Sequence, residues 1–124
     1  MGLLVEKIAI DCVDAYGLAV FWSGVTGCPV DPEDGPGSDE TDVMVAVGPS
    51  LHFNEVPEPK REKNRVHLCL RPDTTCAREV ERVTELGATL VEDRRRSGGL
   101  GWVVLADPEG NEFCVLRGEA ERGG

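Results

Sequence analysis

Two stretches in the second half of the chain alternate between apolar and polar residues. Residues 65–71 read RVHLCLR, and residues 111–116 read NEFCVL. Because successive side chains of a β-strand point to opposite faces, this alternation predicts two strands with polar side chains on the face opposite their bulky apolar residues. The side chains predicted on these polar faces are His67, Cys69, Glu112 and Cys114. Such a face lines either a core or a binding site.

Two further segments show the three- and four-residue spacing of amphipathic helices. Residues 15–26 read AYGLAVFWSGVT, and residues 74–86 read TTCAREVERVTEL. Short polar residues favour the N-cap of a helix, and glycine favours the position just after its last turn. The predicted N-caps are Asp14 and Asp73, and the predicted terminal glycines are Gly27 and Gly87.

Short apolar runs separated by turn residues predict the remaining strands. They lie at residues 7–12, 28–30, 43–47 and 51–56, and then at residues 66–71, 88–93, 102–106 and 111–116, with a tight DPEGN turn at 107–111. Each half therefore runs strand, helix and three strands, which is an internal repeat. We predict an α+β fold of two βαβββ modules, module 1 at about residues 5–56 and module 2 at about 65–117, joined by a charged, proline-rich linker at 57–64.

Composition and charge narrow the classes of function. The 124 residues carry 23 acidic and 13 basic side chains, for a net charge of −10. Since nucleic-acid binding depends on neutralising phosphates, this charge argues against a nucleic-acid partner and favours a cationic ligand.

No apolar run approaches the ~18 residues of a membrane span, and the N-terminus lacks signal-peptide features, so we expect a cytoplasmic protein without a membrane partner. The five cysteines include no C-x-x-C pair and are expected to be reduced thiols.

The repeat resembles the vicinal oxygen chelate superfamily, which includes glyoxalase I, bleomycin-resistance proteins and extradiol dioxygenases. The segments that carry the resemblance are LHFNEVPEPK at the join, NRVHLCLRPD opening the second half and GWVVLADPEGNEFCVL closing it. The chain looks most similar to the small glyoxalase-like domains of this superfamily. The resemblance implies that residues 1–124 form a single domain, with a cup-shaped mixed β-sheet, helices on its outer face and assembly as a homodimer. It is a weak guide to the reaction, because the superfamily hosts many chemistries.

The resemblance also implies a set of metal ligands. Metal-dependent members place two ligands in each module, and the matching positions in the second module are His67 and Glu112, the latter also being the expected catalytic carboxylate. In the first module His52 lines up with Glu112. At the remaining position, spacing points to Ile8, which cannot ligate, whereas alternation leaves Asp11 facing the cup. Two histidines and a carboxylate suit a divalent ion of zinc, iron, manganese, nickel or cobalt.

Plainer interpretations of these residues stay open. A strand histidine satisfied by hydrogen bonds would explain His67, and pairing with Arg71 would explain Glu112, both without a metal. Cys69 and Cys114 are expected to line the cleft, either as soft ligands and reactive thiols or as inert packing.

The same choice applies to two features of the expected cleft wall. Trp102 is expected to line the cleft, as a wall or by stacking on a ligand. Arginines 94–96 flank a glycine-rich loop and either hold a carboxylate or remain solvated.

Two functions follow from these observations. The first is a metal-dependent lyase, isomerase or dioxygenase that acts on a small oxygenated molecule. The second is a metal-free protein that sequesters a small antibiotic-type molecule. A regulatory domain is a third class, for which the sequence offers no positive feature.

Overall fold

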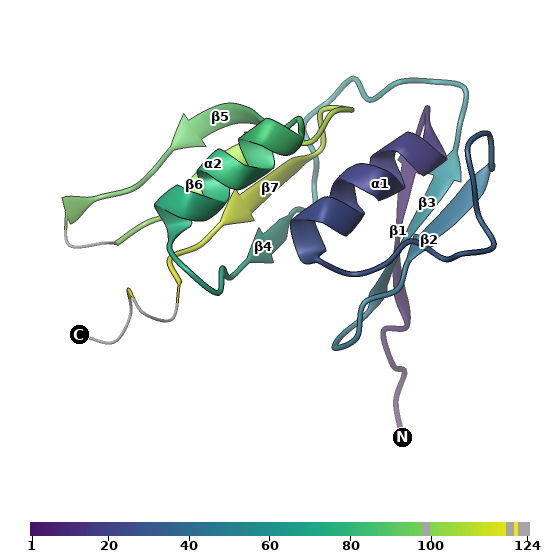
Figure 1. The fold of residues 1–124 in the computed structure, drawn as a ribbon, viewed down its shortest axis with the longest axis horizontal. Helices are drawn as coiled ribbons and strands as arrows, with labels where there is room; N and C mark the ends of the chain where they lie inside the picture. Colours follow the sequence, from purple (N-terminus) through teal and green to yellow (C-terminus); the bar gives the residue numbers. More distant parts are fainter. Residues whose placement is uncertain (98–99, 119–120, 122–124) are drawn as a thin grey trace. The chain divides into compact units, whose positions relative to one another are not determined.

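The computed structural model describes residues 1–97, 100–118 and 121, so residues 98 and 99 of the predicted glycine-rich loop lie outside the described part. The chain divides into two units, Met1–Lys60 and Arg61–Gly124, and in the described residues of each unit a helix packs on a β-sheet (Figure 1). None of the described helices is long and apolar enough to span a membrane.

The first unit is built on a mixed three-stranded sheet. Its elements are β1 (Lys7–Cys12), α1 (Ala15–Thr26), β2 (Glu40–Val43) and β3 (Ser50–Glu55). The strand order is β1-β3-β2, in which β1 runs parallel and β2 antiparallel to β3. Helix α1 contacts all three strands. The buried side chains that join helix and sheet include Leu18, Trp22, Val43, Leu51 and Phe53.

The second unit is built on a mixed four-stranded sheet. Its elements are β4 (Leu68–Leu70), α2 (Cys76–Leu86), β5 (Thr89–Asp93), β6 (Val103–Ala106) and β7 (Glu112–Val115). The strand order is β4-β7-β6-β5, with β4 parallel to β7 and the other pairs antiparallel. Helix α2 contacts β7, and the buried side chains of this unit include Val83, Val103, Leu105 and Phe113.

The turn between β6 and β7 is the one predicted from DPEGN. The Gly110 amide donates to the Asp107 carbonyl at 2.9 Å, and Gly110 has a φ of 88°, which glycine adopts without strain. The buried Asp107 carboxylate accepts from the backbone amides of Glu109 and Asn111, both at 2.9 Å. These bonds hold the start of β7 in place.

The predicted α+β class and its βαβββ order are confirmed. Helix α1 matches residues 15–26, with Asp14 as N-cap and Gly27 in the left-handed conformation at a φ of 71°. In the first unit a single bridge from Val30 to Val43 takes the place of the strand predicted at residues 28–30, since the flanking prolines lack an N–H donor.

Two further predicted boundaries are wrong. The strand predicted at residues 43–47 lies at Glu40–Val43 instead, because the polar Asp42 is paired with Lys7 and therefore tolerated in the sheet. The N-cap of α2 is Thr75 and not Asp73, because the Thr75 hydroxyl accepts from the Arg78 amide at 3.2 Å.

The N-cap of α1 allows a test of what stabilises the first unit. The Asp14 carboxylate accepts from the Gly17 amide at 3.0 Å, which satisfies one of the free N–H groups at the start of the helix. We expect Asp14→Ala to lower the free energy of unfolding by about 1 kcal/mol and Asp14→Ser to change it by much less. Urea unfolding measures both, and an alanine variant as stable as the parent would contradict the assignment.

Candidate functional site

The sheet of the second unit has one covered face and one open face. Along β7, the fully buried Phe113 alternates with Glu112 and Cys114, which therefore point to the opposite side. The neighbouring strands are in register with β7, so Cys69 of β4 and Val104 of β6 both lie beside Cys114. We call this side of the sheet the open face.

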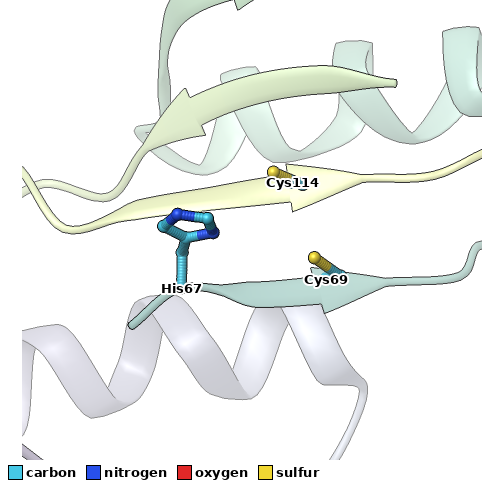
Figure 2. A group of neighbouring side chains, drawn as sticks. All are labelled: His67, Cys69 and Cys114. Atoms are coloured by element: carbon cyan, nitrogen blue, oxygen red, sulfur yellow. The ribbon is translucent and has the colours of Figure 1, made fainter. Parts of the chain in front are cut away.

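A histidine and two cysteines meet on the open face. One potential ligand atom from each of His67, Cys69 and Cys114 lies within 4.8 Å of the other two. Figure 2 shows the His67 ring and the Cys69 thiol projecting toward β7, which carries Cys114. His67 and Cys69 are exposed, whereas Cys114 is only 6% exposed.

The environment of Cys114 keeps its thiol protonated at neutral pH. Burial, together with a smaller effect of the neighbouring Cys69, raises the pKa of Cys114 to about 11 against an opposing effect of Lys63. A thiol with such a pKa is a poor nucleophile until a cation takes the place of its proton.

The Glu112 side chain is fixed by the segment that precedes β4. The Asn64 amide donates to Glu112 Oε1 at 3.4 Å, and the Glu112 amide donates to Asn64 Oδ1 at 3.2 Å. Lys63 Nζ lies 3.4 Å from Glu112 Oε2. Asn64 also donates through Nδ2 to Asn111 Oδ1 at 3.3 Å, which ties its side chain to the residue before β7.

These side chains line a pocket of about 240 Å³, which we call the sheet pocket. Its lining residues are Lys63, His67, Val91, Glu92, Arg94, Trp102, Val104, Glu112 and Cys114. A second hollow of about 480 Å³ is lined by Glu92, Trp102 and Arg94–Arg96, so Glu92, Arg94 and Trp102 belong to both. The combined wall carries several cationic side chains beside its carboxylates.

Arg94 and Trp102 are held together at the rim. The Arg94 amide donates to the Trp102 carbonyl at 2.8 Å, and the guanidinium carbon lies 5.9 Å from the centre of the indole ring. Arg94 Nε also lies 3.1 Å from Glu92 Oε2. A Cβ on Gly101 would lie 2.0 Å from the Arg94 carbonyl oxygen, so only glycine allows this approach.

The other two predicted site residues, His52 and Asp11, belong to the first unit. His52 Nδ1 is hydrogen-bonded to Asp42, and His52 Nε2 lies 2.9 Å from Asn54 Oδ1 and 3.5 Å from Glu40 Oε1. Asp11 lies on the exposed edge strand β1, opposite Asn54 in the register. The convergence of His52 with His67 and Glu112 therefore stays a prediction.

The hydrogen bond between His52 and Asp42 shifts the pKa of each residue. The hydrogen bond to Asp42 raises the pKa of His52 above its usual value, although partial burial opposes the shift. Burial would raise the pKa of Asp42, but hydrogen bonds from His52 and Lys7 together lower it. A carboxylate at Nδ1 is also the partner that commonly orients a histidine ligand.

Two residues beside Glu112 are not indicated by the sequence pattern. Lys63 and Asn64 fall in the predicted linker at residues 57–64, where a run of charges indicated solvent exposure. Their contacts reach Glu112, which is 48 residues from Asn64 in the chain. No local pattern reports such a contact, and only the hydrogen-bonding capacity of an asparagine next to a strand points to it.

The chain matches a known protein family. Residues 7–116 match the profile of the Glyoxalase-like domain, and the chain belongs to this family, which agrees with its resemblance to the vicinal oxygen chelate superfamily. No curated protein sequence matches the chain.

Solved structures share this fold. A glyoxalase/bleomycin resistance protein/dioxygenase family enzyme from Burkholderia phytofirmans is 17% identical with a TM-score of 0.71, over 91% of this chain and 97% of that one. A variant of the fosfomycin resistance protein FosX from Listeria monocytogenes, in complex with Mn(II) and 1S,2S-dihydroxypropylphosphonic acid, is 17% identical with a TM-score of 0.71, over 99% and 98%. At this identity the likeness shows the fold alone.

We expect the pair of His52 and Asp42 to make the stability of the first unit depend on pH. Because the folded-state pKa of His52 is raised, its contribution is fully present below the unfolded value of about 6.5 and is lost as pH rises through the folded value. The contribution of Asp42 has the opposite sign: its lowered pKa makes it present above about pH 4 and lost in stronger acid. The window in which both contribute fully therefore lies between about pH 4 and 6.5.

We expect His52→Gln to lower the free energy of unfolding by up to about 1 kcal/mol inside this window and by less at about pH 9. Urea unfolding followed by Trp22 fluorescence, in a Trp102→Phe background, reports on the first unit. An equal loss at both pH values would show that the pair does not titrate as described.

Proposed function

We propose that this protein binds a small oxygenated molecule with an acidic group in the sheet pocket. The observation that carries the proposal is the lining of that pocket, in which His67 and Glu112 lie with Lys63, Arg94 and Trp102. A concave wall with a few convergent polar groups is the usual form of a small-molecule site.

The cationic side chains favour an anionic group on the ligand. A guanidinium presents a planar fork of N–H donors that matches a carboxylate or phosphonate, and the indole of Trp102 offers an apolar surface beside it. The net charge of −10 describes the whole surface, whereas the ligand meets a local field to which Lys63 and Arg94 contribute, beside their partners Glu112 and Glu92.

A divalent metal fits part of this pocket. His67 supplies an imidazole and Glu112 a carboxylate, donors that suit zinc, iron, manganese, nickel or cobalt, and His52 is the third ligand proposed for the same ion. When bound, such an ion supplies Lewis-acid polarisation of a substrate oxygen. Glu112 is the carboxylate proposed to take up or return a proton, which supports a lyase, isomerase or dioxygenase as the reaction class.

One observation favours the metal-free alternative, a protein that sequesters an antibiotic-type molecule. The Glu112 carboxylate already lies beside Lys63 and accepts a hydrogen bond from the Asn64 amide, and it needs no metal to balance its charge. For either function we propose a cytoplasmic homodimer that binds neither nucleic acid nor membrane. Light scattering tests the dimer directly.

Ligand binding is tested by thermal shift. Because a ligand that binds only the folded state raises Tm, we expect small phosphonates and hydroxy carboxylates to stabilise the protein more than cationic compounds. Arg94→Gln is expected to weaken the best ligand about tenfold or more, since a charge-assisted hydrogen bond contributes roughly 1.5–3 kcal/mol. Arg78→Gln, which makes the same charge change on α2, is the control. A preference for cations that is unaffected by Arg94→Gln would overturn the proposal.

Metal binding is tested by elemental analysis of tag-free protein loaded with one divalent ion at a time. We expect His67→Ala, Glu112→Gln and His52→Ala each to reduce the bound ion, because all three remove a proposed ligand. Negligible metal in the parent and in every variant would leave the sequestering function. If His52→Ala keeps its metal while the other two variants lose theirs, His52 is not a ligand and the first unit takes no part in the site.

A further inference from the structure

We propose that His67, Cys69 and Cys114 form a site for a thiophilic metal ion, such as Zn²⁺ or Cu⁺. This site shares His67 with the ligand set of the proposed function, but it uses two sulfur ligands and needs neither Glu112 nor His52, so it does not rest on that function. Both sulfur atoms and the imidazole belong to described residues of the second unit, so the site is complete within that unit.

The strand register brings the two thiols together. Cys69 and Cys114 are direct neighbours across the parallel pair of β4 and β7, and both side chains lie on the open face. His67 lies two residues before Cys69 in the chain and joins them from the same side (Figure 2). The arrangement depends on backbone pairing and not on chance contact between mobile side chains.

The spacing is close to that of a coordinated ion. Zinc–sulfur bonds of about 2.3 Å and zinc–nitrogen bonds of about 2.0 Å place tetrahedral ligand atoms roughly 3.5–3.8 Å apart. The three ligand atoms here all lie within 4.8 Å of one another, so closing the set requires shifts of about 1 Å. Rotation about the side-chain bonds of the exposed His67 and Cys69 supplies shifts of this size.

Packing alone does not explain this pair of cysteines. Cys12 and Cys76 are buried, and each thiol has a backbone carbonyl acceptor, as expected of cysteines that act as small apolar residues. Cys69 instead is exposed beside a second thiol and a histidine. Its position is that of a ligand at the surface of the sheet.

The ligand set favours a soft ion over the harder ions that carboxylates prefer. Two thiolates and a neutral imidazole neutralise a divalent cation, and thiolate ligands select zinc and monovalent copper over manganese or magnesium. Three protein ligands leave a fourth position, which zinc enzymes commonly keep for water or substrate. At this site the fourth position would face solvent on the open face, since both His67 and Cys69 are exposed.

The test uses the whole, tag-free protein, stripped of metal and reduced with a phosphine. Cd²⁺ serves as the probe because its thiolate complexes absorb in the ultraviolet, and Zn²⁺ competition against a chromophoric chelator gives affinities. We expect one Cd²⁺ per chain with a thiolate absorption band. Cys69→Ser is expected to weaken Zn²⁺ binding at least tenfold, since loss of even an outer partner of a metal ligand costs roughly 10–100-fold. The exposed position of Cys69 allows this change without disturbing the core.

Two variants serve as controls. Cys28→Ser removes a half-buried thiol of the first unit and is expected to leave the band and the affinity unchanged. Glu112→Gln is expected to retain Cd²⁺ and its thiolate absorption band, so a failure of the carboxylate site and a failure of the thiol site give different results. Absence of the band in the parent, or an affinity for Zn²⁺ that Cys69→Ser does not change, would overturn the proposal.

Discussion

The parallel pairing of β4 with β7 is the constraint on which the second unit depends. The two strands are distant in the chain, and only the crossover through α2, β5 and β6 lets them run side by side. Their register decides which residues share a face, and a slip of one residue would send Cys69 to the opposite side from Cys114. The fully buried Phe113 anchors that register, because its ring has a place only on the covered face.

The pairing of β4 with β7 also produces a local charge pattern unlike that of the whole chain. Asn64 ties the segment before β4 to Glu112 through hydrogen bonds in both directions, and Lys63 is thereby placed beside the same carboxylate. Arg94 joins them in the lining of the sheet pocket. A strongly acidic protein therefore has a pocket wall with cationic groups beside its carboxylates, which net charge alone does not indicate.

The two units have a similar strand order but carry different clusters of polar side chains. In the first unit His52 is held by Asp42 and Asn54, and Lys7 pairs with the same aspartate, so polar side chains of three strands form one hydrogen-bonded network. In the second unit His67 lies with two thiols instead. Repetition of a fold thus preserves backbone positions while the side chains on the open face change, which is why family membership alone does not determine a reaction.

The sequence by itself determined what depends on neighbouring residues: α1 with both of its caps, the DPEGN turn, and the polar face that carries Cys69 and Cys114. Spacing and capping chemistry act within a few residues, so they can be read without a structure. Only the tertiary structure decided that Asp42 lies inside a strand and that Lys63 and Asn64 hold Glu112. Those outcomes depend on partners far away in the chain, and their positions follow from strand order and register, which no local pattern encodes.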